Sequence, residues 1–273
     1  MKLLPNLLIT SLLTFLSFET AAQQATTSPS TSANQSPQRD PQASSILSQT
    51  LNAAGGVSTL GSIRDYTASG VITYHWAGKD VEGSVTVRGR RLDQLRMDSN
   101  LPTGSLSWAA SRGKTAHLEK DGTVSGTQSF AALSPSSFVF PYMELAAAIK
   151  SPQFRLSYKG VAEIDGRSAH RIRVQGPLLG PSDAQEPQSD LDAADFFIDT
   201  STLRVVMLQE ITRPAGNGWQ GPVHQIRFSD YRTLNGVLVP FSMVEAIGAQ
   251  QTWTIQLESI SFNSGLSESN FEL

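Results

Sequence analysis

Cysteine is absent from the 273 residues of the chain. Without it no disulfide can hold the fold together, so the folded state depends on the burial of apolar side chains. A secreted protein of this kind is more typical of a bacterial periplasm than of a eukaryotic extracellular module. We also expect no lipid anchor on an N-terminal cysteine.

A strong excess of charge of either sign is also lacking. Lys and Arg number 21, Asp and Glu number 24, and the formal net charge is -3. This balance gives no general attraction to nucleic acid or to anionic lipid surfaces. With 39% hydrophobic and 16% charged residues, the chain can build a core and is too weakly charged for a disordered polymer. We therefore expect one globular domain and no nucleic-acid partner.

No apolar run is long enough to span a bilayer as a helix. The run at residues 3–18 is shorter than the ~20 residues that a spanning helix needs. It follows Lys2 and precedes the small residues Thr20-Ala21-Ala22, which suit signal peptidase. We interpret residues 1–22 as a cleaved signal peptide and expect a periplasmic protein whose mature chain has no transmembrane span. An uncleaved anchor is the alternative, because Glu19 is atypical of a signal peptide.

The next segment changes from low complexity to an amphipathic pattern. Residues 23–42 are mostly Ser, Thr, Gln, Pro and Ala, which cannot offset the entropy of ordering, so we predict a flexible leader. Apolar positions within residues 43–54 follow one helical face, and Gly55-Gly56 supplies a left-handed stop. The sequence thus predicts a first helix there, at the start of a single domain over residues 43–273.

From Tyr66 onward the period of the apolar residues changes from near 3.6 to 2. Alternation of this kind is typical of strands with one dry and one wet face. Similar runs recur near 66–76, 81–87, 92–98, 105–111, 115–120, 153–159, 169–175, 194–199, 203–212, 223–230, 237–246 and 250–262. Short Gly, Asn or Asp turns separate them, which indicates about ten or eleven strands in an antiparallel meander.

One helical segment interrupts the strands. Ser134-Pro135 opens it, Ser151-Pro152 ends it, and the residues between are largely apolar. The fold class is therefore α+β: a large, strongly curved antiparallel sheet, an incomplete barrel, with two or three helices covering its concave face. Because two short helices can hardly cover so many strands, we expect a residual apolar cavity.

The last strands carry a clear turn signal. Asn235-Gly236 predicts a type I′ hairpin turn within the segment FSDYRTLNGVLVPF, residues 228–241. Pro240 cannot donate to a strand ladder, so we place it near an edge or a bulge. The apolar phase changes after Leu257, which predicts a bulge near Glu258 and Ser259.

Motifs for catalysis or cofactor binding are weak. Residues 216–221, GNGWQG, match a dinucleotide fingerprint but precede a strand instead of a helix, so a hairpin loop is the better interpretation. Ser125 lies one place late for a nucleophile elbow and within a hairpin. The acidic segment 183–199 lacks the spacing of a calcium loop. We expect no catalytic residue and no cofactor.

The histidines do not suggest a metal site either. His75, His117, His170 and His224 lie in separate predicted strands, with no ligand spacing between them. We expect them at the surface or at the rim of the sheet.

Two sets of residues are candidates for a binding site. The large apolar side chains that we expect to line the cavity and its lid are Tyr74, Trp76, Trp108, Phe138, Phe140, Met143, Leu145 and Trp253. Guanidinium groups suit phosphate and other acidic head groups. The basic cluster that we expect to contact a head group or the lid is Arg88, Arg90, Arg91 and Arg96. The alternative for the apolar set is that its members are ordinary core residues. The alternative for the arginines is that they lie at solvated strand ends.

Several segments together resemble a known family. A signal, a helix ending at Gly55-Gly56, then YTASGVITY, VRGRRLDQLRMD, DFFIDTSTLRVV and FSDYRTLNGVLVPFSM, follow in the order seen in the outer-membrane lipoprotein carrier superfamily, the LolA/LolB-like fold. The resemblance covers roughly residues 43–271. It implies a curved incomplete barrel with helices as a lid over an apolar cavity that takes acyl chains, and an arginine of the third-strand region, among the four named above, holding the lid.

The leading hypothesis is a non-enzymatic periplasmic carrier that holds an acyl chain, another lipid or a lipoprotein, with an envelope protein as a possible partner. An envelope structural or interaction module with a self-filled core is the main alternative. An enzyme of unrecognised type is a third hypothesis. An outer-membrane barrel is disfavoured because Arg155, Glu163 and residues 171–173 interrupt a lipid-facing band.

Overall fold

A computed structural model describes residues 39–76, 78–111, 114–118, 123–127, 134–176, 193–211 and 221–273. All of them belong to one compact unit, which spans Ser36–Leu273. The predicted signal peptide lies outside the described residues, as do most of the GNGWQG loop and most of the acidic segment.

The strands form one continuous antiparallel sheet of 13 strands. The sequence predicted the α+β class, the antiparallel pairing and the incomplete barrel correctly, although it gave about ten or eleven strands. The strands are β1 Asp65–Trp76, β2 Lys79–Arg90, β3 Gln94–Leu101, β4 Gly104–Ser111, β5 Lys114–Leu118, β6 Val124–Thr127, β7 Arg155–Ile164, β8 Arg167–Gln175, β9 Ala193–Asp199, β10 Val205–Ile211, β11 Val223–Leu234, β12 Val237–Ile247 and β13 Gln250–Phe262.

The strand order shows how the chain builds this sheet. From edge to edge it runs β6-β5-β4-β3-β2-β1-β13-β12-β11-β10-β9-β8-β7. β1 lies in the middle of the sheet, and β2 to β6 follow in sequence order to one edge. The chain then crosses to β7 at the opposite edge, and β8 to β13 follow in order back to the middle, where β13 pairs with β1. The sheet stays open because β6 and β7 are not paired with each other. The segment that crosses between the two edges must therefore pass over one face of the sheet.

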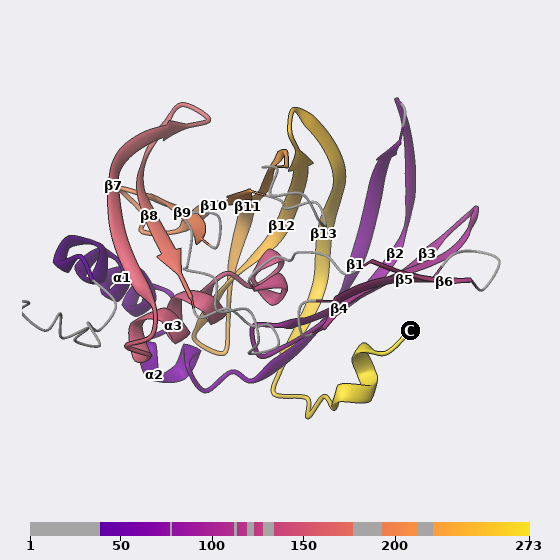
Figure 1. The fold of residues 1–273 in the computed structure, drawn as a ribbon, viewed down its shortest axis with the longest axis horizontal. Coiled ribbons are helices and arrows are strands. Elements are labelled where there is room, and N and C mark those ends of the chain that lie inside the picture. The colour runs from indigo at the N-terminus through magenta and orange to yellow at the C-terminus, as the bar shows by residue number, and fades with distance from the viewer. Residues whose placement is uncertain are drawn as a thin grey trace, which may run out of the picture. The chain divides into compact units, whose positions relative to one another are not determined.

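The crossing segment holds the helices η1 Pro135–Phe138 and α3 Tyr142–Lys150. Pro135 and Pro141 stand at the starts of these two helices, where a missing N–H costs nothing. The sequence predicted one helical segment here, and the structure divides it in two. Figure 1 shows α3 on the hollow side of the curved sheet, between β7 and the central strands.

The first helix, α1 Pro41–Ala53, starts two residues before the predicted Ala43. The Asp40 carboxylate caps it by accepting hydrogen bonds from the backbone N–H groups of Gln42 at 2.8 Å and Ala43 at 3.2 Å. The residues that the sequence assigned to the end of the flexible leader thus form the cap and first turn. α1 contacts α3 and β7, beside which it lies in Figure 1.

Behind α1 the chain turns at Gly55, whose φ is +126°. A Cβ atom there would lie 2.6 Å from the carbonyl oxygen of Gly236, so only glycine fits. The Leu238 N–H donates to the carbonyl of Ala54 at 2.9 Å, which fastens the end of α1 to the hairpin of β11 and β12. A short helix, α2 Val57–Leu60, then leads into β1.

The turn and bulge predictions for the last strands are confirmed. Asn235 and Gly236 both have positive φ, +50° and +80°, as a type I′ turn requires. The β1–β13 register shifts between Ser69 and Gly70, which leaves Glu258 unpaired as the predicted bulge. Pro240 pairs with Tyr231 of β11, and the β12–β13 pairing begins only at Ser242, so Pro240 lacks a neighbour on its other side.

The core lies between the helices and the concave face of the sheet. It is one continuous cluster that includes residues of α1, η1 and α3 together with the inward side chains of most strands. A much smaller cluster of Ala169, Phe197 and Met207 lies on the opposite face. The C-terminal helix η3 Glu268–Phe271 contacts β3 and β4.

Candidate functional site

Five of the side chains predicted to line a cavity are part of the core. Phe138, Phe140, Met143, Leu145 and Trp253 are each exposed by 6% or less. They belong to the same continuous cluster as the inward residues of the sheet. These side chains are thus packed against the protein's own atoms, and Met143 also borders the pocket described below.

The aromatic rings of this region contact one another edge to face. The Phe140 ring centroid lies 6.3 Å from that of Tyr66 and 5.8 Å from that of Tyr142, with interplanar angles of 68° and 69°. The Tyr66 hydroxyl donates to the carbonyl of Ser136 at 2.8 Å, which fixes η1 to β1. The crossing segment is therefore held mainly by apolar contacts, with a few backbone hydrogen bonds.

The other three predicted lining residues lie at the border of the core. Tyr74 and Trp108 are half-buried and pack against its edge. Trp76 is 42% exposed at the end of β1 and stacks on Tyr74, with ring centroids 4.8 Å apart. The structure thus divides the predicted apolar site into a buried group under the helices and an aromatic group at the rim.

The four candidate arginines are divided as well. Arg88 and Arg96 both bind Asp98, at 2.5 Å and 2.9 Å, on the face of the sheet opposite the core. Arg96 also donates to the carbonyl of Glu272. These two arginines therefore join strands and the C-terminal segment on the outer face, where they cannot reach the helices that cover the core.

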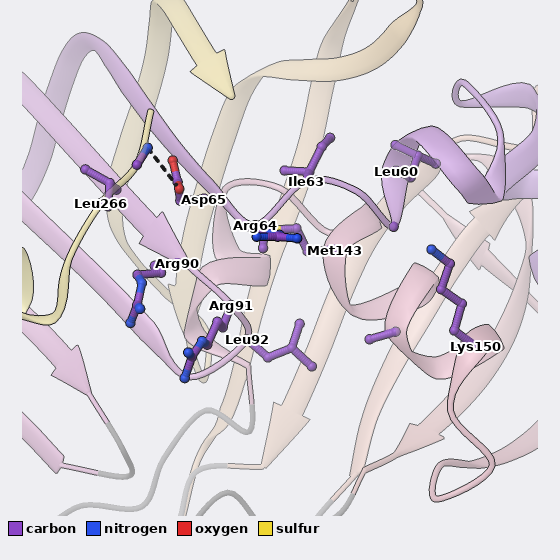
Figure 2. Close-up of a pocket in the computed structure, with 13 residues that line it drawn as sticks. Leu60, Ile63, Arg64, Asp65, Arg90, Arg91, Leu92, Met143, Lys150 and Leu266 are labelled. Atoms are coloured by element: carbon purple, nitrogen blue, oxygen red, sulfur yellow. Dashed lines mark hydrogen bonds between the residues drawn. The ribbon is translucent and has the colours of Figure 1, made fainter. Parts of the chain in front are cut away.

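Arg90 and Arg91 line an open pocket of about 480 Å³ at one end of the sheet. Figure 2 shows its lining from four segments: the turn after α2 with the start of β1, the β2–β3 turn, α3, and the chain after β13. We call this site the rim pocket. It is lined by Leu60, Gly61, Ile63, Arg64, Asp65, Arg90, Arg91, Leu92, Met143, Ala147, Lys150, Gly265 and Leu266.

Backbone hydrogen bonds hold the walls of the rim pocket together. The Arg91 N–H donates to the carbonyl of Arg64 at 2.8 Å, which ties the β2–β3 turn to the start of β1. The Ser136 hydroxyl donates to the carbonyl of Arg91 at 2.7 Å. The Asp65 carboxylate accepts from the backbone N–H groups of Ser264 at 2.6 Å and Gly265 at 3.2 Å. The only acidic group in the lining is therefore engaged in fixing one wall.

Four cationic side chains surround an apolar floor in this pocket. Arg90 donates to Gln94 at 2.7 Å and lies 3.9 Å from Glu268. Within the described part of the chain, the side chains of Arg64, Arg91 and Lys150 have neither an ion pair nor a hydrogen bond. Three of the four cations of the rim pocket thus have no carboxylate partner among the described residues, and Asp65 is the one acidic residue in the lining.

A second arrangement on the concave face was not predicted. The His224 ring of β11 lies between two glutamates of the neighbouring strands, Glu210 of β10 at 2.8 Å from Nδ1 and Glu245 of β12 at 2.9 Å from Nε2. Glu245 also accepts a hydrogen bond from the Thr252 hydroxyl. The Phe138 ring of η1 contacts the imidazole edge to face, with centroids 4.8 Å apart. The expectation of a surface position for His224 is wrong, since it is only 4% exposed.

The electrostatics of this buried group involve a further glutamate. Burial alone would lower the pKa of His224, but hydrogen bonds and charges from Glu210 and Glu245 outweigh it and raise the pKa to about 10. Burial raises the pKa of Glu144 of α3 to about 8, and the charge of Glu210 adds to the increase. At neutral pH the group therefore holds a charged histidine and a protonated Glu144.

This network fits ion pairing better than metal binding. Both imidazole nitrogens already face carboxylates, and among the described residues no three His, Cys, Asp or Glu side chains are arranged to hold a metal. His224 shares the inward phase of Ile226 and Phe228, and Glu144 is the one carboxylate in the apolar helix YMELAAAIK. These were the available sequence signals for a buried polar group.

Ser125 and the other three histidines lie where they were expected from the sequence. Ser125 lies in β6 and pairs with His117 of β5, in a hairpin. His75, His117 and His170 are half-buried or exposed, as expected. No helix in the described ranges is long and apolar enough to cross a membrane.

Comparison with known proteins gives a match at the level of structure. No protein-family model and no curated protein matches the sequence. A LolA superfamily protein from Nitrosomonas europaea superposes with a TM-score of 0.50 at 9% identity, covering 85% of this chain and 97% of that chain. An outer membrane lipoprotein-sorting protein domain from Vibrio parahaemolyticus has a TM-score of 0.48 at 11% identity, covering 85% of this chain and 96% of that chain. A DUF1329 family protein from Desulfovibrio piger has a TM-score of 0.47 at 13% identity, covering 83% of this chain and 97% of that chain.

The architecture defines an open antiparallel half-barrel whose concave face is covered by the helices that cross between its two edges. Within this class, the chain has the fold of the LolA superfamily. The resemblance seen in the sequence is thereby confirmed for the fold, and fold alone does not determine function.

Proposed function

We propose that this protein is a non-enzymatic lipid carrier of the bacterial periplasm. It holds an acyl chain between the crossing helices and the concave face of the sheet, and it is secreted by cleavage after residue 22. The observation that carries the proposal is the rim pocket, whose lining includes Met143 and Ala147 of α3, the helix that covers the concave face.

Size and chemistry support this assignment. The pocket volume of about 480 Å³ falls within the ~300–1,000 Å³ typical of small-molecule sites. Each buried methylene contributes roughly 0.8 kcal/mol, so an alkyl chain needs little polar specificity to bind. Separation of α3 from the sheet would lengthen the apolar floor, because Met143 and Leu145 cover part of the core.

The experiment is native mass spectrometry of the protein purified from its own envelope, together with titration of a fluorescent fatty acid. We expect a co-purified lipid mass and saturable probe binding. Ala147→Trp should fill the pocket beside α3 and weaken probe binding. The matched control Ala53→Trp, at an exposed position at the end of α1, should leave it unchanged.

The second candidate is an envelope interaction module with a filled core. The burial of Phe138, Phe140 and Trp253 against the protein's own side chains favours it. A lipid-free mass together with no probe response would establish this alternative and overturn the carrier. N-terminal sequencing of the secreted protein tests the cleavage site separately.

A further inference from the structure

We propose that the rim pocket binds the anionic head of a single-chain amphiphile, a phosphate or carboxylate, while the alkyl chain lies on the apolar floor toward α3. This deepens the proposed function and rests on it, because it specifies which class of lipid the carrier takes. The shared chemistry is one anionic group attached to one hydrocarbon chain.

Three cationic side chains of the rim pocket have no carboxylate partner among the described residues. Arg64, Arg91 and Lys150 line one pocket and have no polar side-chain partner among the described residues. Arginine pairs elsewhere are satisfied: Arg171 and Arg173 share Asp195 at 2.5 Å and 2.8 Å. In a chain of net charge -3, such a local excess is complementary to an anion. Two guanidinium forks can each donate two hydrogen bonds to phosphate oxygens.

The backbone at Arg91 adopts a conformation that is uncommon for a residue with a long side chain. Its φ is +52°, in the left-handed region that glycine and asparagine adopt far more readily. A long side chain there is conformationally costly, because its Cβ atom approaches the backbone carbonyl oxygen. The conformation places Arg91 in the β2–β3 turn at the pocket border, where Figure 2 shows it beside Arg90 and Leu92. Five other non-glycine residues of the described chain also have positive φ, so this conformation supports the inference through the position it gives Arg91 at the pocket and not through its rarity.

The floor of the rim pocket is the apolar part of its lining. Leu60, Ile63, Leu92, Met143, Ala147 and Leu266 provide an apolar surface directly beside the cations. Lys150 lies across the end of α2, where a Cβ atom on Gly61 would come within 2.0 Å of its Nζ atom. A free inorganic anion would use the charges but leave this floor uncovered, whereas an amphiphile uses both.

The experiment compares dodecyl ligands below their micellar concentration by isothermal titration calorimetry. The ligands are dodecyl phosphate, neutral dodecyl maltoside and cationic dodecyltrimethylammonium, with inorganic phosphate as the chain-free control. We expect dodecyl phosphate to bind at least about tenfold more tightly than the maltoside, a difference of ~1.4 kcal/mol. The preference should weaken as salt concentration rises.

Two triple variants test the assignment to this pocket. Arg64→Gln/Arg91→Gln/Lys150→Gln should bind dodecyl phosphate and dodecyl maltoside equally, with maltoside affinity unchanged. Lys79→Gln/Arg155→Gln/Arg167→Gln removes the same charges from exposed positions outside the pocket and should keep the preference.

Each alternative result has a defined meaning. Equal binding of phosphate and maltoside ligands by the unmodified protein would overturn the inference and leave the carrier function standing. Equal loss in both triple variants would overturn it too, because the preference would then arise from net charge. Inorganic phosphate binding as tightly as dodecyl phosphate would assign the pocket to a free anion, and no binding of any dodecyl ligand would remove the carrier function itself.

Discussion

His224 Nε2 lies 2.9 Å from Oε1 of Glu245, within the covered concave face of the sheet. The pair joins β11 to β12, while Glu210 joins the same imidazole to β10 at 2.8 Å. Three neighbouring strands thus meet in one buried ionic network, under the Phe138 ring of η1. The network contacts the helical cover through Phe138, and its shifted pKa values couple protonation to the stability of the fold.

The first prediction is that thermal stability falls as pH rises from 5 to 9. The folded-state pKa of His224 is raised from 6.5 to about 10, so its contribution is complete below pH 6.5 and is lost as pH approaches 10. The pKa of Glu144 is raised from 4.5 to about 8, so the folded state also binds the extra proton between these values. Both pKa shifts make the free energy of unfolding decrease as pH rises.

Thermal melts followed by circular dichroism across this range measure the effect. The depressed pKa of Asp199, about 2, concerns only strongly acidic solutions and does not enter the window. A melting temperature that is constant or increases between pH 5 and pH 9 would contradict the assignment.

The second prediction isolates Glu144. Glu144→Gln keeps the shape of the side chain but removes its ionisation, so it should flatten the stability profile between pH 5 and pH 8. At pH 8 or above we expect it to be more stable than the unmodified protein by roughly 2–4 kcal/mol. Urea denaturation at several pH values measures this difference. The exposed Glu163→Gln on β7 serves as the control and should leave the profile unaltered.

The third prediction concerns the cap of α1. Asp40 accepts hydrogen bonds at the helix start and also one from the Tyr158 N–H of β7 at 3.3 Å. Asp40→Ala should lower the midpoint of thermal unfolding by a few degrees, because two N–H groups lose their cap, whereas Asp40→Asn should retain most of the stability. Equal losses in the two variants would show that the charge matters more than the cap.

The fourth prediction uses the close approach at Gly61. Gly61→Ala places a methyl group 2.0 Å from the Nζ atom of Lys150 and 2.9 Å from the carbonyl oxygen of Val57, so the lysine and, to a smaller extent, the end of α2 must shift, while the φ of -78° is compatible with alanine. The lysine must move although its charge remains. We expect about a twofold to fivefold loss of dodecyl phosphate affinity, in line with one weakened charge contact, and no change for the maltoside. Improved phosphate binding would place Lys150 outside the site.

Local patterns in the sequence determined much of the fold. Alternation identified the strands, Asn235-Gly236 gave the hairpin, and the phase change after Leu257 located the bulge at Glu258. These features depend on residues close in sequence, so they can be predicted without knowing the partners. Each of the twelve alternating runs coincides with a strand, so the estimate of ten or eleven was too low, and the one strand without such a run is β6, which is only four residues long.

The candidate site was harder to predict, because it depends on contacts between distant segments. Arg88 and Arg91 are only three positions apart in sequence, yet strand alternation places Arg88 on the outer face and the turn places Arg91 in the rim pocket. Arg64 and Lys150 join that pocket from other elements. Similarly, the network of His224 requires the register of three strands, which no single segment reveals.

The pairing of β1 with β13 also sets the order in which the protein can be completed. Tyr66 meets Phe262 and Tyr74 meets Trp253, so the middle of the sheet is joined by residues from opposite ends of the domain. Until the final strand is synthesised, the strands can form only two separate half-sheets, which are connected through the segment that contains η1 and α3. Such long-range closure is slow, and a protein built this way exposes unpaired strand edges to aggregation until its last residues have been delivered.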